Sequence, residues 1–265
     1  MSLNDWIIDL AQSGVTCFSL QQVKKTFDAR TEQSLKTDLN RLVRAKKIQS
    51  AYRGFYVIIP IQYQRKGIVP PVYYVNELMA YLEKPYYVGL LSAAALYGAS
   101  HQRAMLTQVV TVGPRPRVPS INSLIDWNYR QQIPTELLES RNGEMGKVVF
   151  SSAELTAVDL VQFARNVGGY QRAATVLAEL EEVLDMDKME RVLPYTKMSA
   201  MQRLGYVFEF VLEEQEKADF LYELLRRHYG YFGAVLMNPQ RPASVESESN
   251  RWRVNMNIEI EIDEL

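Results

Sequence analysis

Residues 19–58 read SLQQVKKTFDARTEQSLKTDLNRLVRAKKIQSAYRGFYVI, and this stretch decides the fold of the N-terminal part of the chain. Ser19 is followed three residues later by Gln22, which is the spacing of a capping box at the start of a helix. A short helix is therefore predicted from Ser19 to Phe27. The turn formed by residues 28–30 separates it from a second helix.

The second helix, predicted over about residues 31–46, has apolar side chains on one face. They follow the spacing i, i+4, i+7 and i+8 and comprise Leu35, Leu39, Leu42 and Val43. This spacing places them in a single stripe along the helix. The stripe must pack against the preceding helices, which leaves the opposite face of the helix free.

The free face is rich in side chains that bond nucleic acids. It contains no Asp or Glu, and its members are Arg30, Gln33, Ser34, Thr37, Arg41 and Arg44, with Lys36 and Asn40 at its edges. Arg, Asn and Gln pair with base edges in the major groove, whereas Arg, Lys, Ser and Thr bond phosphate oxygens. The face is typical of a recognition helix that lies in the major groove of duplex DNA.

Two short β-rich runs, residues 48–50 and 55–58, follow the second helix. The segment between them ends in Gly54, which tolerates the positive φ of a tight turn. This hairpin predicts the wing of a winged helix-turn-helix, with Arg53 at its tip and Tyr52 beside it. We expect these two side chains to bind DNA as well, because a wing commonly touches the backbone or the minor groove.

The charge is distributed unevenly along the chain. Residues 1–66, here called the head, contain 11 Lys and Arg against 5 Asp and Glu, a net charge of +6, whereas the remaining 199 residues contain 19 against 26, a net charge of −7. The total of −1 conceals a basic head on an acidic body, which favours a polyanion as the partner of the head alone. A solvated helix face, or a winged helix that binds protein, is the alternative interpretation.

Length and composition indicate a folded protein of more than one domain. The chain has 265 residues, 47% of them hydrophobic and 23% charged. We expect it in the cytoplasm and away from membranes, because no apolar run approaches the ~18 residues of a membrane span and the N-terminus lacks the pattern of a signal peptide. The one cysteine, Cys17, has apolar neighbours and is expected to be a buried, unreactive side chain.

Breaker residues between Ile59 and Pro71 mark the predicted domain boundary. A DNA-binding winged helix-turn-helix is expected over residues 1–66 and a larger domain over residues 72–265. In the larger domain we predict strands over 108–112, 121–127, 147–150 and 257–263, and helices over 75–82, 87–98, 151–165, 170–184, 198–212 and 217–229. The chain is thus predicted to be an α+β protein, with the winged helix-turn-helix followed by a mixed, mostly helical α/β domain.

The sequence contains none of the common catalytic or metal-binding patterns. The two histidines, His101 and His228, are far apart and have no partner at ligand spacing, and no phosphate-binding glycine loop or nucleophile elbow occurs. A metal-dependent nuclease based on Asp126, Glu144 and Lys147 is the alternative. The two residues between Glu144 and Lys147 would place them on opposite faces of a strand, so no catalytic residue, metal or cofactor is predicted.

Three parts of the sequence resemble the AbiEi family of antitoxins and transcriptional regulators. They are the wing motif RGFY at residues 53–56, the segment YYVGLLSAAALYGASHQ at residues 86–102 and the run QVVT at residues 108–111. Together with the head they cover roughly residues 5–112. Some members of the family have a histidine where Tyr97 stands here, so no special role is assigned to that position.

The resemblance implies that the chain binds repeats in its own promoter through the winged head and represses that promoter. It also implies that the C-terminal domain counters a toxin encoded by the neighbouring gene, which in such operons resembles a nucleotidyltransferase. A winged-helix repressor whose C-terminal domain senses a small molecule is the second interpretation of the same sequence.

Overall fold

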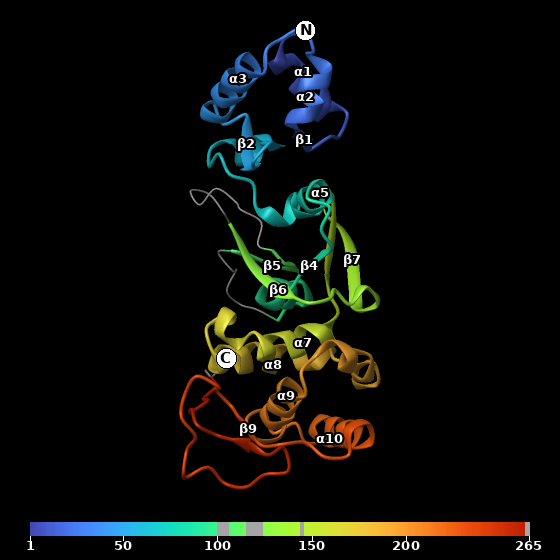
Figure 1. Ribbon diagram of the computed structural model, residues 1–265, viewed down its shortest axis with the longest axis vertical. Coiled ribbons are helices and arrows are strands. Elements are labelled where there is room, and N and C mark those ends of the chain that lie inside the picture. Colours follow the sequence, from blue (N-terminus) through green and yellow to red (C-terminus); the bar gives the residue numbers. More distant parts are fainter. Residues whose placement is uncertain (100–105, 115–123, 144–145, 263–265) are drawn as a thin grey trace. The chain divides into compact units, whose positions relative to one another are not determined.

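The computed structural model describes residues 1–99, 106–114, 124–143 and 146–262. The chain divides into two compact units, whose helices and strands are labelled in Figure 1. Unit 1 comprises Met1–Tyr86, Met105–Ile133 and Ser140–Val149, and unit 2 comprises Tyr87–Ala104, Pro134–Glu139 and Phe150–Leu265. The predicted α+β class is confirmed, because several helices accompany small sheets and more residues are helical than extended.

The head is a winged helix-turn-helix. Its elements are α1 (Leu3–Gln12), β1 (Cys17–Ser19), α2 (Leu20–Thr26), α3 (Glu32–Arg44), β2 (Ile48–Tyr52), β3 (Phe55–Ile58) and α4 (Ile61–Gln64). The three strands form an antiparallel sheet in the order β1-β3-β2, in which Cys17 lies opposite Val57 and Ile48 opposite Ile58. β2 and β3 confirm the predicted wing strands, whereas β1 was not anticipated from the sequence.

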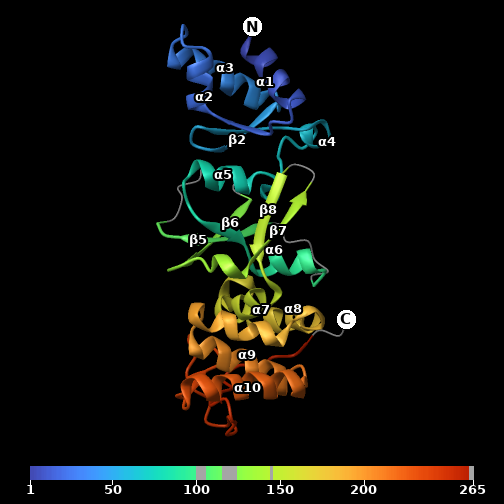
Figure 2. The same cartoon turned by 90° about the vertical axis from the view of Figure 1, so that its right-hand side faces the viewer.

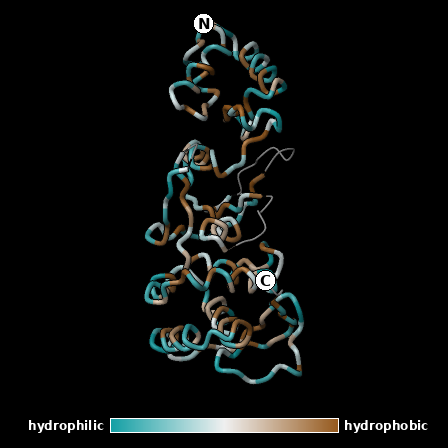
Figure 3. Tube along the Cα trace, turned by 180° about the vertical axis from the view of Figure 1, so that it is seen from behind, coloured by the Kyte–Doolittle hydropathy of each residue, from teal (hydrophilic) through white to brown (hydrophobic). Residues whose placement is uncertain are grey.

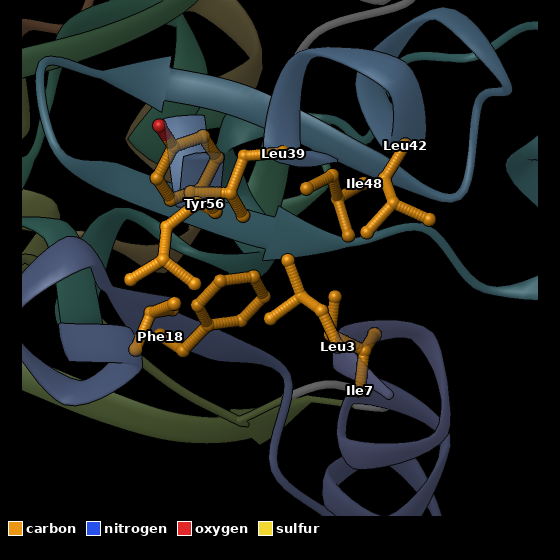
Figure 4. Packing of buried hydrophobic residues seen from close by; sticks show 9 residues of the cluster. Leu3, Ile7, Phe18, Leu39, Leu42, Ile48 and Tyr56 are labelled. Atoms are coloured by element: carbon orange, nitrogen blue, oxygen red, sulfur yellow. The ribbon is translucent and has the colours of Figure 1, made fainter. Parts of the chain in front are cut away.

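One apolar core holds the head together, and Figure 4 shows side chains from α1, α3 and the sheet meeting in it. Its buried members are Leu3, Ile7, Phe18, Val23, Leu35, Leu39, Leu42, Ile48 and Tyr56. The rings of Phe18 and Tyr56 stack with centroids 5.5 Å apart, and Trp6 meets Phe18 edge to face at 5.3 Å. Burial of a leucine side chain contributes about 1.5–3 kcal/mol, so the leucines of α3 supply a large share of the stability of the head.

The caps of α2 and α3 follow the predicted signals. The backbone N–H of Gln22 donates to the Ser19 hydroxyl at 3.2 Å, and the Gln22 side chain accepts from the backbone N–H of Ser19 at 2.7 Å. Thr31 caps α3 by accepting from the backbone N–H of Ser34 at 3.3 Å. The predicted capping box is confirmed, and both helices lie within two residues of their predicted bounds.

Cys17 is half-buried in β1, and the Thr16 hydroxyl lies 3.7 Å from its sulfur. Burial raises the pKa of the Cys17 thiol to about 12. The thiol therefore stays protonated at neutral pH, and the thiolate is the form that acts as a nucleophile.

A five-stranded sheet follows the head in the strand order β6-β5-β4-β8-β7. The head leads into it through the 3-10 turn η1 (Pro71–Tyr73) and α5 (Val75–Tyr81), and its strands are β4 (Tyr86–Val88), β5 (Thr107–Val112), β6 (Ile125–Arg130), β7 (Leu138–Gly143) and β8 (Gly146–Ser151). β5 and β6 pair in parallel from Thr107 opposite Ile125 onward, and Val88 of β4 lies opposite Phe150 of β8.

The sequence predicted part of this sheet. The strands expected over 108–112 and 147–150 are confirmed, and the strand expected over 121–127 is confirmed from Ile125, where β6 begins. Its first part, residues 121–123, lies outside the described residues. The helix expected over 87–98 is wrong at its start, where β4 runs to Val88. The pairing of β4 with β8 overrides the helical pattern of this small-residue segment, and β7 was not anticipated.

Unit 2 is built around a buried helix, α7 (Ala153–Gln162). The helices packed around α7 are α6 (Leu90–Ala94), α8 (Tyr170–Leu180) and α9 (Met198–Phe210), with α10 (Gln215–Tyr229) against α9. Figures 1 and 2 show α8 beside α7 and α10 beside α9, and Figure 3 shows hydrophobic and hydrophilic residues interspersed along these helices. The 3-10 segments are η2 (Ala95–Tyr97), η3 (Thr135–Leu137), η4 (Ala164–Val167), η5 (Glu181–Val183) and η6 (Met186–Tyr195). The helices expected over 170–184, 198–212 and 217–229 are confirmed with shorter or shifted ends.

Every residue of α7 from Ala153 to Val161 is buried, as expected of a helix covered on all sides. Asp159 accepts a hydrogen bond from the hydroxyl of Tyr87 at 2.6 Å, and Glu154 accepts from the backbone N–H of Asp185 at 3.1 Å. Such bonds lower the cost of burying a carboxylate. The polar side chains of α7 therefore tie it to segments that are distant in the sequence.

The capping box predicted for Ser151 and Glu154 is wrong. Ser151 lies in β8, and the hydroxyl of Ser152 caps α7 by accepting from the backbone N–H of Leu155 at 3.3 Å. Glu154 instead accepts the hydrogen bond from the backbone N–H of Asp185. Two adjacent serines offer the same local signal, and the end of β8 decides which of them caps the helix.

One aromatic side chain joins the C-terminal segment, residues 231–257, to α9. Trp252 is fully buried, and a Cβ atom added to Gly205 would come within 2.1 Å of its ring. The indole N–H of Trp252 donates to Glu209 at 2.6 Å, and the Gln202 amide donates to the Trp252 carbonyl at 2.7 Å. The absence of a side chain at Gly205 is therefore what lets the indole lie against the backbone of α9.

The strand predicted over residues 257–263 is wrong within its described part, residues 257–262. β9 (Val235–Leu236) and β10 (Val254–Asn255) pair in parallel, and no strand is assigned from Met256 to residue 262. The alternation of apolar and acidic residues is still seen in their burial. Ile258, Ile260 and Ile262 are half-buried, whereas Glu259 and Glu261 are exposed. A strand needs a neighbouring backbone ladder, whereas the Asn257 amide here donates to the Asn238 carbonyl at 2.9 Å.

We expect Gly205→Ala to destabilise unit 2, because its methyl group would overlap the indole ring of Trp252. Overpacking of this kind costs about 1–3 kcal/mol or more, and urea unfolding followed by circular dichroism measures the loss. Gly233→Ala is the control, since a Cβ atom there meets no atom within 4 Å. Equal losses in the two variants would contradict the assigned contact.

Candidate nucleic-acid interface

The candidate interface is the face of α3 that points away from the core of the head. Leu35 and Leu39 are fully buried and Leu42 nearly so, which turns the intervening residues outward. The exposed members of the predicted set on this helix are Gln33, Lys36, Thr37, Asn40, Arg41 and Arg44. Gln33, Thr37, Asn40 and Arg44 follow the spacing i, i+4, i+7 and i+11, so they form one continuous stripe.

Two other residues of the predicted set are less accessible. Arg30 and Ser34 are half-buried, and Nη2 of Arg30 donates to the Ser34 hydroxyl at 2.8 Å and to Asp38 at 2.6 Å. Arg30 therefore lies along α3. The structure thus separates an exposed stripe from an arginine that is bound within the head.

Two carboxylates lie beside the stripe, although the free face of the helix was predicted to contain none. Asp38 binds Arg30 and also Arg41, whose Nη2 is 3.1 Å from Oδ1. Glu32 binds Lys36 at 2.6 Å and forms a second ion pair with Lys24 of α2. The spacing of three residues between Asp38 and Arg41 was the signal that could have revealed the first of these clusters.

The cations keep both carboxylates ionised. The hydrogen bond from Arg30 holds the pKa of Asp38 below its ordinary value. Hydrogen bonds from Lys24 and Lys36 lower the pKa of Glu32 to about 2. At neutral pH each cluster therefore consists of one negative and two positive groups, and the net charge of each is positive.

The wing is supported from outside the head by α5. The hydroxyl of Tyr81 donates to the carbonyl of Arg53 at 3.2 Å, and its ring lies 5.3 Å from that of Phe55. Gly54 has a φ of +76°, as the predicted turn requires, and a Cβ atom there would come within 3.0 Å of the Tyr81 oxygen. The Arg53 side chain is exposed and Tyr52 is half-buried, so the backbone of the wing is held while Arg53 faces solvent.

The alternative nuclease site is only partly described by the structure. Asp126 accepts from the Gln108 amide at 3.2 Å, whereas Glu144 and His101 lie outside the described residues. No group of three or more His, Cys, Asp or Glu that could hold a metal occurs among residues that the structure describes. In the same ranges, no helix is long and apolar enough to cross a membrane.

Comparison with known proteins gives a match to a family model and a similar solved structure. Residues 87–210 match the family model of the AbiEi antitoxin C-terminal domain. A search of curated proteins gave no match. The fold is similar to that in the crystal structure of the Rv2827c protein from Mycobacterium tuberculosis, with a TM-score of 0.66 and 16% sequence identity, over 94% of this chain and 88% of that chain.

The family match confirms the resemblance inferred from the sequence and extends it. It begins at Tyr87, inside the motif of residues 86–102, and continues to Phe210 at the end of α9. It thus includes the helices α7, α8 and α9, which lie beyond the segments that carried the resemblance. An antitoxin and regulatory role is supported by this match, because residues 87–210 are similar to the C-terminal domain of the AbiEi antitoxins.

Proposed function

We propose that the chain is a DNA-binding autorepressor and the antitoxin of a toxin–antitoxin operon. Residues 1–66 bind repeats in the promoter of the operon, and residues 72–265 counter the toxin encoded by the neighbouring gene, which is expected to resemble a nucleotidyltransferase. The role is not catalytic and uses no cofactor, and its place is the cytoplasm. The exposed stripe of α3 carries this proposal, together with the antitoxin match of residues 87–210.

The chemistry of the exposed side chains of α3, those of the stripe together with Lys36 and Arg41, suits readout of duplex DNA in the major groove. Arg41 and Arg44 can bond guanine, and Gln33 and Asn40 can bond adenine, in each case with two hydrogen bonds. Lys36 and Thr37 offer groups for phosphate oxygens. All six side chains are exposed, which supports insertion of α3 into the major groove as the recognition helix, as in other helix-turn-helix proteins.

The charge of the chain supports a division of labour. The net charge of +6 on residues 1–66 attracts a polyanion, whereas the net charge of −7 on the remaining residues repels one. The larger domain is therefore more suited to acting on a protein, or through a folded partner surface, than on nucleic acid. This agrees with a domain that opposes a toxin.

Binding to the promoter should weaken steeply with salt. If the head neutralises about 5 phosphates, the logarithm of the association constant should fall with the logarithm of the salt concentration at a slope of roughly −4 to −5. Fluorescence anisotropy of the full chain with a labelled promoter duplex, at three salt concentrations, measures this slope. A flat dependence would show that the basic head does not meet phosphate.

Arg41 and Arg53 should contribute in different ways. Arg41→Ala should cost about 1–3 kcal/mol on the promoter and less on a scrambled duplex, because it removes contacts to base edges. Arg53→Ala should weaken both duplexes to a similar extent, because the wing is expected to bind the backbone. The same anisotropy assay compares them, and equal losses on the two duplexes for Arg41→Ala would refute its role as a base reader.

Repression and antitoxin activity should be separable. The double variant Arg41→Ala and Arg44→Ala in the full chain should lose repression of a promoter reporter and still relieve growth arrest by the toxin in a co-expression assay. Lys188→Ala is a matched control, since it removes an exposed cation from unit 2. Loss of growth rescue in the folded double variant would contradict the proposed division of labour.

A further inference from the structure

Two arginines beside the stripe, Arg30 and Arg41, are held by one carboxylate, which is unfavourable for attraction to DNA. Oδ2 of Asp38 is 2.6 Å from Nη2 of Arg30, and Oδ1 is 3.1 Å from Nη2 of Arg41. Each carboxylate oxygen thus serves one guanidinium group. A negative charge beside a DNA-binding face weakens the attraction to every phosphate, so its presence there must be offset by another gain.

The two arginines differ in what remains available to a ligand. The Arg30 side chain is 35% exposed and also bonds Ser34, whereas the Arg41 side chain is 79% exposed. A guanidinium has five N–H donors in a rigid fork. Arg41 therefore has donors that face solvent while one side of the group contacts Asp38. The carboxylate itself is only 22% exposed, so its contacts are less screened by water than those of a fully exposed pair.

The contact between Asp38 and Arg41 restricts where Arg41 can point. The two residues are three apart on one helix, so the contact is local to α3 and needs no other element of the head. A long side chain that is already restricted loses less rotational freedom when it binds. A bidentate contact with a guanine edge requires one direction of approach, whereas a phosphate can be reached from many directions.

We propose that Asp38 is a positioning residue for sequence recognition. It orients Arg41 toward a base edge, and its charge lowers the affinity of α3 for DNA of any sequence. The charge effect lowers both affinities alike, whereas the orientation of Arg41 increases the ratio between specific and non-specific affinity, which is the quantity that selects a site among many competitors. The inference rests on the proposed function, the binding of promoter DNA through α3.

Glu32 provides a charge-matched comparison on the same helix. It too lies between two cations, but these are Lys24 and Lys36, and its own side chain is 46% exposed. A lysine ammonium is a point charge without a planar fork to orient. Glu32→Gln should therefore change the attraction to all DNA in the same way as Asp38→Asn, without releasing an arginine.

The experiment measures association constants of the full chain for two duplexes by fluorescence anisotropy at three salt concentrations. One duplex is the promoter region of the operon, and the other is a scrambled duplex of the same composition. Asp38→Asn and Glu32→Gln should each raise the affinity for the scrambled duplex by roughly 3- to 10-fold at ~0.1 M salt, because loss of one negative charge acts like about one more phosphate contact. Asp38→Asn alone should lower the ratio of the two constants, by at least about fivefold.

A double substitution separates positioning from a general structural effect. In the background of Arg41→Ala, Asp38→Asn should cause no further loss in the ratio, because Asp38 acts through Arg41. Asp38→Ala, which places a strong helix former on α3, is the second variant if the asparagine variant unfolds. The thermal midpoint of each variant is measured beforehand.

Three outcomes would overturn the inference in different ways. If the wild-type chain distinguishes the two duplexes and the ratio is unchanged in the folded Asp38 variants, the role of Asp38 is wrong and the proposed function stands. If the wild-type chain does not distinguish them, the proposed function is wrong and the inference falls with it. A fall in the ratio of the same size for Glu32→Gln would reduce the effect to charge alone and refute positioning.

Discussion

The burial of three leucines on one side of α3 is the constraint on which the DNA-binding proposal depends. Leu35, Leu39 and Leu42 enter the core that α1, α2 and the small sheet share. A helix that buries one stripe must turn the opposite stripe outward. The polar residues of α3 are therefore presented to solvent as a consequence of core packing, and a slip of one residue along the helix would rotate them by about 100°.

Unit 2 is stabilised by burial of a whole helix rather than of one apolar face. Its central helix α7 is covered on all sides, and its buried carboxylates are paired with Tyr87 and with the backbone at Asp185. The indole of Trp252 then fixes the C-terminal segment on α9, at the position where Gly205 leaves room. The interior of unit 2 is thus defined by contacts between segments that are distant in the sequence. Few of these contacts leave a recognisable pattern in the local sequence.

The electrostatics of the head are less simple than its net charge indicates. Two carboxylates of α3 each lie between two cations, since Asp38 joins two arginines and Glu32 joins two lysines. A face of this kind attracts DNA through its net positive charge, while the carboxylates limit how the cations can extend. The cations therefore attract DNA, whereas the carboxylates of α3 restrict the directions in which those cations can point.

The sequence by itself determined the winged head, the capping of α2 and α3, the outward stripe of α3 and the resemblance to the AbiEi family. These features depend on contacts between residues a few positions apart, so periodicity and capping motifs record them. Only the tertiary structure decided the strand β4 in a segment that reads as helix, the loss of the strand predicted after residue 256, and the pairing of Asp38 with Arg30. Each of these depends on a partner that is distant in the sequence or on the direction of a side chain, and neither is encoded in a local pattern.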